Sequence, residues 1–324
     1  MRVALKKSGM RLLAPKSLPS CRVSETLHMT RIPVILNPRA GLDDAARIEE
    51  IRAAFASHRI FAEIRISGEG GDLTSLVRTC VDEACPIVVV GGGDGSLHTA
   101  ASALVGTATA LGILPVGTLN HFAKDLGVPL GVAEAVAVIA AGVTRSVDVG
   151  EANGQVFINN ASLGLYPAVV RQREAIRERL GRSKWPAMAL ALWRALVRYR
   201  LLHVRVQVEE KDLVRRTPFV FIGNNPYTMD GLNIGSRVVL DGGTLSLYMA
   251  RREGPFSLVL LALRALVGRL RQARDFEEFT ATSVRVETRR SQEHVGLDGE
   301  VVTMQTPIQC RIRPLALRVV VPAA

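Results

Sequence analysis

In the first half of the chain, short apolar runs alternate with stretches whose apolar residues recur every three or four positions. The short runs predict buried strands, and the periodic stretches predict amphipathic helices. Strands that alternate with helices in this way predict a mostly parallel sheet with flanking helices, that is, an α/β domain. The expected strands are Ile32–Leu36, Phe61–Ile66, Ile87–Val90 and Leu111–Leu114, and the expected helices are Asp43–Ser57, Gly71–Ala84, Ser96–Leu104, a segment around Phe122, and Val132–Ala141.

After Val147 the pattern changes. Over Val204–Val208, valines alternate with polar residues, which is typical of a strand with one buried face. We therefore predict a second, mainly antiparallel domain and place the boundary near Ser146–Gly150, with residues 31–147 before it and 148–324 after it. Further strands are expected at Phe219–Ile222, Leu245–Met249, Val284–Glu287 and Leu317–Val321.

Two helical stretches interrupt the second domain. Arg171–Arg200 carries nine Arg or Lys residues around an apolar stripe that contains Trp185 and Trp193. This combination is typical of a helix at a membrane surface, and also of a solvated basic face over an ordinary core stripe. The second stretch is Phe256–Arg274.

The first 30 residues contain scattered basic residues, Pro and Ser but no continuous hydrophobic segment, so they do not predict a secretory signal. Met29 precedes the first strand, and we treat the leader as disordered or as a start-site error. No apolar run reaches the roughly 18 residues that a membrane span requires, because Arg264 interrupts the most apolar segment. We expect the chain to contact a membrane without crossing it.

Composition adds a preference for anionic partners. The chain has 41 Lys and Arg residues against 30 Asp and Glu, a formal charge of +11, which favours lipid headgroups, nucleotides or nucleic acid. Its 324 residues and 48% hydrophobic content suit two folded domains. Cys21, Cys80, Cys85 and Cys310 form no CxxC pair, which argues against a disulfide framework and favours a reducing cytosol.

The main chemical signal is a strand that ends in glycines. Ile87–Val90 runs directly into a Gly-Gly-Gly-Asp-Gly-Ser segment, Gly91–Ser96. Glycines let backbone N–H groups approach an oxyanion, and a following helix adds its positive N-terminal end, so the pattern predicts a phosphate cradle. The alternative is a glycine-rich turn required for packing. A second turn, at Gly117 and Thr118, follows the next strand and favours the cradle, because successive strand ends converge on one crevice.

Four motifs, taken in order, resemble a known family. The Gly-Gly-Asp-Gly motif also occurs in NAD kinases and phosphofructokinases, so it does not identify one family by itself. The Gly-Thr-Leu-Asn-His-Phe-Ala motif is specific to one family. The four motifs are Asn37–Gly41, Gly92–Ser96, Gly117–Ala123 with Leu126–Pro129, and Asp298–Glu300. With them, over nearly all of residues 31–322, the chain resembles the soluble bacterial lipid kinases of the diacylglycerol kinase catalytic-domain superfamily, which includes sphingosine and ceramide kinases.

The resemblance implies an N-terminal domain that binds ATP and a C-terminal β-sandwich that shapes a lipid site, with phosphoryl transfer to a lipid hydroxyl in the cleft between them. Glu300 matches the family's proposed general base, and a carboxylate that accepts the alcohol proton suits this reaction. Asp94 is the second candidate catalytic carboxylate, or a ligand of Mg²⁺. The residues implied to hold the nucleotide are Asn37, Ser67, Gly92, Gly93, Asp94, Gly95, Ser96, Leu97, His98 and Thr118.

The chain departs from the family pattern at a second implied Mg²⁺ site. Many relatives carry Asp-Asp-Gly where this chain has Asp241, Gly242 and Gly243. Gly242 replaces the second Asp, or Asp241 fills that place if Gly243 is an insertion, so Asp241 is the remaining candidate ligand. Ser96 keeps the hydroxyl of the family's usual Thr, and Thr99 stands where Glu is common.

Further polar residues accompany these motifs. His98 and His121 lie beside the glycine loops but lack the spacing of a metal site or a catalytic triad, so we interpret their side chains as surroundings. Four asparagines follow expected strands and either line the cleft or satisfy turn backbone, the commoner case. They are Asn159, Asn160, Asn224 and Asn225.

Together these features predict an ATP- and Mg²⁺-dependent kinase for diacylglycerol or a sphingoid-type lipid. We expect it in the cytoplasm, at the inner face of the membrane, with a lipid substrate and an anionic membrane surface as partners and no nucleic acid; the oligomeric state stays open. One alternative is an NAD kinase-like small-molecule kinase. Another is a catalytically silent protein that binds nucleotides or membrane surfaces, against which Asp94 and Glu300 argue.

Overall fold

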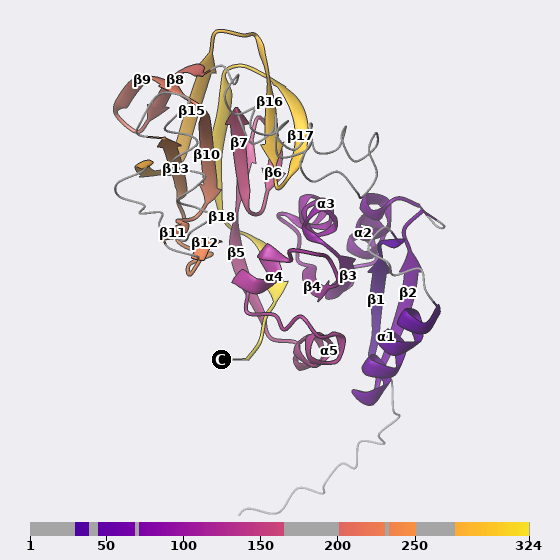
Figure 1. The fold of residues 1–324 in the computed structure, drawn as a ribbon. Coiled ribbons are helices and arrows are strands. Elements are labelled where there is room, and N and C mark those ends of the chain that lie inside the picture. The colour runs from indigo at the N-terminus through magenta and orange to yellow at the C-terminus, as the bar shows by residue number, and fades with distance from the viewer. Residues whose placement is uncertain are drawn as a thin grey trace, which may run out of the picture.

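The computed structural model describes residues 30–38, 45–68, 71–164, 201–230, 233–250 and 276–323. The leader up to residue 29 and the expected helical stretches Arg171–Arg200 and Phe256–Arg274 lie outside these residues, so those expectations stay predictions. Figure 1 shows an α/β N-terminal half joined to a β-rich C-terminal half, which confirms the predicted fold class. Among the described helices, none is long and apolar enough to span a bilayer.

The N-terminal half is built on four parallel strands in the order β2-β1-β3-β4. Apolar runs such as Val88–Val90 are fully buried because helices cover both faces. All the strands and helices expected in this half are present, within a few residues of their predicted ends. They are β1 (Thr30–Leu36), α1 (Ala45–Ser57), β2 (Ile60–Ile66), α2 (Leu73–Asp82), β3 (Ile87–Gly92), α3 (Asp94–Leu104), β4 (Ala110–Pro115), α4 (His121–Asp125) and α5 (Val132–Ala141).

The same sheet continues into the C-terminal half. Strand β18 (Ile308–Val320) pairs in parallel with β4 and antiparallel with β5 (Thr144–Ala152) and β15 (Ser283–Thr288). Strand β5 crosses the region where the boundary is predicted, so one sheet of ten strands runs through both halves. The remaining strands of this sheet are β6 (Gln155–Phe157), β8 (Leu202–Val208) and β9 (Lys211–Thr217).

A second, six-stranded antiparallel sheet completes the C-terminal half in the order β14-β13-β10-β7-β16-β17. Alternating residues of the two sheets, such as Val206, Ile222 and Ile308, enclose a separate core, which confirms the expected β-sandwich. Its strands are β7 (Asn160–Gly164), β10 (Phe219–Asn224), β13 (Leu245–Ala250), β14 (Phe276–Ala281), β16 (Gln292–Leu297) and β17 (Glu300–Gln305). Strands β11 (Thr228–Asp230) and β12 (Asn233–Ser236) pair antiparallel in a separate two-stranded sheet.

Candidate active site

The residues implied to hold a nucleotide lie at the carboxyl ends of adjacent parallel strands. Asn37 directly follows β1, Ser67 directly follows β2, Gly92 ends β3, and Thr118 follows β4. The backbone N–H of Asn37 donates to the carbonyl of Gly91 at 3.0 Å, which ties two of these ends together. This edge is where open α/β sheets bind ligands. The structure therefore brings the sequence-predicted nucleotide residues to one place.

The two glycine turns at this edge meet backbone to backbone. A Cβ atom at Gly117 would overlap the Cα of Gly93 and lie 2.8 Å from Oδ1 of Asn120. A Cβ atom at Gly92 would overlap the side chain of Ser96. Both positions require glycine for packing, so the packing interpretation of the loop holds alongside the cradle interpretation, which stays a prediction.

Helix α3 begins inside the glycine loop. Gly93 is its N-cap residue, and no side chain of the described residues caps this end. The backbone N–H groups of the first turn and the helix dipole therefore remain available to an anion. Beside this turn, Nδ2 of Asn37 donates to Oγ of Ser96 at 2.8 Å. The side chain of Leu97 is fully buried in the core, so only its backbone can face a ligand.

Asp94 links the two glycine turns. Its Oδ1 accepts the backbone N–H of Phe122 at 3.1 Å, and its Oδ2 accepts that of His121 at 3.2 Å. These N–H groups open α4, so the carboxylate acts as a cap for that short helix from 27 residues away. Sequence reasoning missed this contact, and a direct part for Asp94 in catalysis or metal binding stays a prediction.

The C-terminal half contributes an Asp-Gly turn between β16 and β17. Asp298 and Gly299 both have positive φ, at 48° and 96°, which suits a two-residue hairpin loop. The buried carboxylate of Asp298 accepts the backbone N–H groups of Ile158, Asn159 and Asn160 at 2.7, 2.7 and 2.9 Å. These bonds anchor the turn on the loop before β7.

The anchored turn presents Glu300 to the glycine loop. A Cβ atom at Gly95 would lie 3.2 Å from Oε1 of Glu300, so the carboxylate lies against the first turn of α3. Glycine at this position leaves room for that approach. The structure thus brings together the two motifs that the family resemblance links, from opposite ends of the chain.

His98 also joins this site. Its Nδ1 lies 2.7 Å from Oδ2 of Asp298, and its side chain is 15% exposed. Burial opposes a charge on the ring, but the bond to Asp298 and the charges of Asp298 and Glu300 outweigh it, so the pKa of His98 is raised above its ordinary value of 6.5. The sequence did not predict this bond, because the spacing of residues along the chain does not identify a partner 200 residues away.

A buried arginine, Arg237, also binds the loop before β7. Arg237 is 4% exposed, and it forms an ion pair with Asp125 at 2.8 Å, across the two halves. It also donates to the carbonyl of Ile158 at 2.7 Å and to Oδ1 of Asn159 at 2.6 Å. Asn224 donates to the same carbonyl, at 2.9 Å, so its side chain satisfies turn backbone, whereas that of Asn159 accepts from Arg237.

The candidate Mg²⁺ ligand Asp241 is engaged elsewhere. Its carboxylate pairs with Arg145 at 2.7 Å. The glycines that follow are held by Oδ1 of Asn225 at 2.9 Å and Oδ2 of Asp148 at 2.7 Å. The described residues contain no group of three or more His, Cys, Asp or Glu side chains that could hold a metal. Mg²⁺ that arrives with nucleotide phosphates needs only one or two carboxylates, so Asp94 remains able to contact it.

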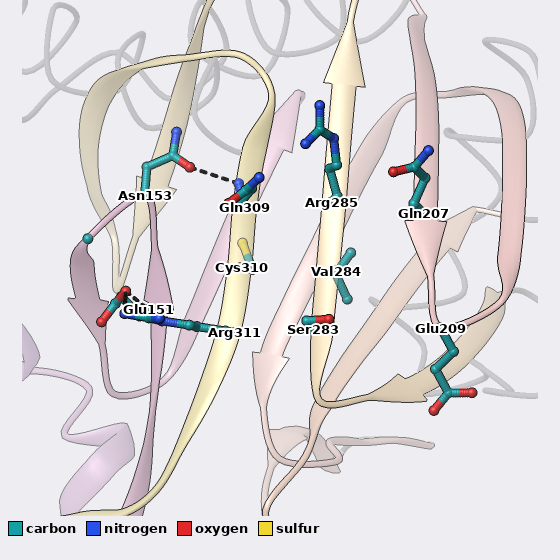
Figure 2. Close-up of a pocket in the computed structure, with 11 residues that line it drawn as sticks. Glu151, Asn153, Gln207, Glu209, Ser283, Val284, Arg285, Gln309, Cys310 and Arg311 are labelled. Atoms are coloured by element: carbon teal, nitrogen blue, oxygen red, sulfur yellow. Dashed lines mark hydrogen bonds and ion pairs between the residues drawn. The ribbon is translucent and has the colours of Figure 1, made fainter.

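A polar cavity of about 650 Å³ lies on the outer face of the ten-stranded sheet and includes none of the predicted site residues. Figure 2 shows side chains from β5, β8, β15 and β18 around it, with Glu151 beside Arg311 and Asn153 beside Gln309. Glu151 pairs with Arg311 at 2.6 Å. Arg285 pairs with Glu287 at 3.0 Å, so both of the cavity's arginines are neutralised by carboxylates.

Both halves of the chain match known protein families. Residues 31–152 match the family described as Diacylglycerol kinase catalytic domain, and residues 159–321 match the YegS C-terminal NAD kinase beta sandwich-like domain. Proteins named "Probable lipid kinase YegS-like" are similar in sequence. In Pseudomonas aeruginosa PAO1 the match is 40% identical over 36% of this chain and 40% of the relative. In Pseudomonas savastanoi pv. phaseolicola it is 30% identical over 90% and 94%.

In the relatives from Pseudomonas aeruginosa PAO1 and Pseudomonas syringae pv. tomato, the matched region spans 40% and 55% of the relative's own length. Among solved structures, a putative diacylglycerol kinase from Bacillus anthracis str. Sterne superposes with a TM-score of 0.70 at 24% identity, over 90% of this chain and 96% of that one. Another diacylglycerol kinase structure from the same organism gives 0.67 at 23% identity, over the same shares. At this identity the likeness concerns the fold.

Proposed function

The chain belongs to the YegS family of the diacylglycerol kinase catalytic-domain superfamily, and from this premise we propose that it transfers the γ-phosphoryl group of ATP to a lipid hydroxyl. The observation that carries the proposal is the position of Glu300. Its carboxylate comes from the C-terminal half and lies against Gly95, at the edge where the N-terminal strands end. A base beside a phosphate cradle is the arrangement that phosphoryl transfer requires.

In this proposal the N-terminal half positions ATP, the phosphoryl donor. The uncapped first turn of α3 and the Gly117 turn offer backbone N–H groups to the phosphates. Because Asp94 joins the two turns, they form one preorganised cradle. Mg²⁺ bound to the nucleotide would neutralise part of the phosphate charge.

Glu300 acts on the acceptor. The lipid hydroxyl oxygen forms a bond to the γ-phosphorus while the bond from that phosphorus to the β,γ-bridging oxygen breaks. Glu300 takes the hydroxyl proton, and ADP leaves with the bridging oxygen. The proposed acceptors are lipids with a free hydroxyl near the headgroup, either diacylglycerol or a sphingoid-type lipid.

We also propose that the protein works in the cytoplasm at an anionic membrane surface. The support is the net charge of +11 and the nature of the substrate. Sedimentation with vesicles of phosphatidylglycerol and phosphatidylcholine is expected to fall steeply as salt rises, because each Lys or Arg near such a surface contributes about 1 kcal/mol. Binding that does not change with salt would remove this part of the proposal.

The test of the function is transfer of label from [γ-³²P]ATP by the full chain. Diacylglycerol, a sphingoid base and ceramide are presented in mixed micelles with Mg²⁺, and NAD is a separate arm because the C-terminal half matches an NAD kinase-like sandwich. We expect label in a lipid and none in NAD. Label only in NAD would support the small-molecule kinase, and ATP binding without transfer to any acceptor would support the silent alternative.

A further inference from the structure

His98 lies at the contact between the two halves of the site. It is on α3, one turn after Gly95, and its Nδ1 meets the carboxylate of Asp298 in the turn that carries Glu300. Residues three apart on a helix share a face. The two positions therefore look toward the same turn, Gly95 toward Glu300 and His98 toward Asp298.

The chemistry of Asp298 fixes the role of the histidine. Its Oδ2 accepts the backbone N–H of Ile158 and its Oδ1 accepts those of Asn159 and Asn160, so the group is an ionised acceptor. Nδ1 of His98 must therefore carry a hydrogen, and its N–H donates a hydrogen bond to Oδ2 of Asp298. This is the one described bond from the Asp298 side chain to the N-terminal half, since the other three go to the loop before β7.

The charges around His98 are both acidic. Asp298, in the turn between β16 and β17, binds the ring, and Glu300, at the start of β17, adds a second negative charge that raises the pKa of His98. The bond to Asp298 and the negative charges of Asp298 and Glu300 favour the charged form of the ring, against the effect of burial, so the pKa of His98 is raised. Neither Asp298 nor Glu300 has a described Lys or Arg within ion-pair distance.

We propose that His98 is a positioning residue for Glu300: by binding Asp298 it locks the Asp-Gly turn against α3, so that Glu300 is held beside the ring and the glycine loop. The inference rests on the proposed function, in which Glu300 is the base. The bond joins residues from both halves, so it sets the distance between the base and the donor. Phosphate binding does not depend on it, because the cradle is made of backbone within the N-terminal half.

The enzymatic test compares His98→Asn and His98→Ala with the wild type over about pH 6 to 9.5, using the lipid that accepts label. Asn keeps a donor without a charge, and His58→Asn, on the exposed turn after α1, is the matched control. We expect kcat to fall about tenfold in His98→Asn and about a hundredfold in His98→Ala, because small displacements of a catalytic group have effects of this size. The KM for ATP should stay within about twofold of the wild type.

The pH profile separates positioning from a structural role. The wild-type kcat should decline on the alkaline side as the charged ring loses its proton, and this limb should be absent in His98→Asn. In a Glu300→Gln background, His98→Asn should add no further loss, because it acts through Glu300. A wild-type kcat in His98→Asn, or a uniformly lowered profile of unchanged shape with a raised KM for ATP, would overturn the inference. Full activity in Glu300→Gln would instead overturn the proposed function.

A second measurement does not depend on turnover. The His98 ring is titrated by NMR in the wild type and in Glu300→Gln, with Glu210→Gln, in the exposed turn between β8 and β9, as control. Removing the Glu300 charge should lower the titration midpoint of His98, and the control should leave it unchanged. An unchanged midpoint in Glu300→Gln would overturn the inference even if no lipid accepts phosphate.

Discussion

Phe122 donates its backbone N–H to the carboxylate of Asp94 at 3.1 Å, so the second glycine turn is fastened to the first by a side chain. The acid in the Gly-Gly-Asp-Gly motif therefore has a structural task that its sequence context does not reveal. It caps α4 and holds two strand ends in one geometry. Any effect of changing Asp94 on nucleotide binding includes the loss of this geometry.

Replacement of Asp94 by Asn should weaken both the fold and ATP binding. The amide keeps one acceptor oxygen and turns an NH₂ group toward a backbone N–H, so we expect the free energy of unfolding to fall by about 1–2 kcal/mol. Urea denaturation and calorimetric titration with ATP measure the two effects. Asp82→Asn, at an exposed position at the end of α2, should change neither. Unchanged stability in Asp94→Asn would mean that the capping bonds contribute nothing.

Replacement of Gly95 by Ala should lower turnover without lowering stability. Gly95 lies in the first turn of α3, where Ala is the better helix former by up to about 1 kcal/mol. Its Cβ would sit 3.2 Å from Oε1 of Glu300, which must move by a few tenths of an ångström. We expect kcat to fall about tenfold while the thermal midpoint holds or rises. Full turnover in a stable variant would show that the Glu300 contact is not tied to catalysis.

Replacement of Gly117 by Ala should destabilise the fold itself. Here the new Cβ meets backbone atoms of Gly93 rather than a side-chain end, so the two turns must separate. We expect a loss of about 1–3 kcal/mol in denaturation experiments, as in overpacked sites, together with weaker ATP binding. A Gly117→Ala variant with normal stability would contradict the close packing of the turns.

The bond between His98 and Asp298 should make stability depend on pH. The pKa of His98 is raised in the folded protein, so its stabilising contribution is complete below about 6.5, the unfolded value, and is lost as pH rises through the folded value. The difference in unfolding free energy between the wild type and His98→Asn should therefore be largest near pH 6 and shrink toward about pH 9. A difference that grows with pH would mean that the bonded ring is neutral.

The α/β half follows closely from the sequence because its strands are continuous apolar runs. Val88–Val90 is buried on both faces, so an uninterrupted apolar run predicts the strand, and the glycine turns at the strand ends locate the site. Helix α3 nevertheless starts at Asp94, two residues before the predicted Ser96. Glycine favours turns, so the sequence pattern places Gly95 outside the helix, whereas the structure includes it in the first turn.

The sandwich was harder to predict because its strands carry polar residues and glycines. Strands β7 and β16, at Asn160–Gly164 and Gln292–Leu297, lack a clean apolar alternation and were not expected. In β18 only the end was predicted, since a register shift between Arg313 and Leu317 breaks the pattern. The bonds of Asp298 could not be found from sequence, because its partners lie in two segments, at His98 and at Ile158–Asn160, that are far from it in the chain.

The proposed phosphoryl transfer depends most on Glu300 acting as the base beside a phosphoryl group that the N-terminal half holds. The most direct measurement is lipid-dependent transfer from [γ-³²P]ATP by the wild type and by Glu300→Gln side by side, with ATP affinity measured by calorimetry on the same preparations. We expect a turnover in Glu300→Gln that is lower by about 10² to 10⁴ and an ATP affinity that is largely kept. An unchanged turnover number would show that Glu300 is not the base.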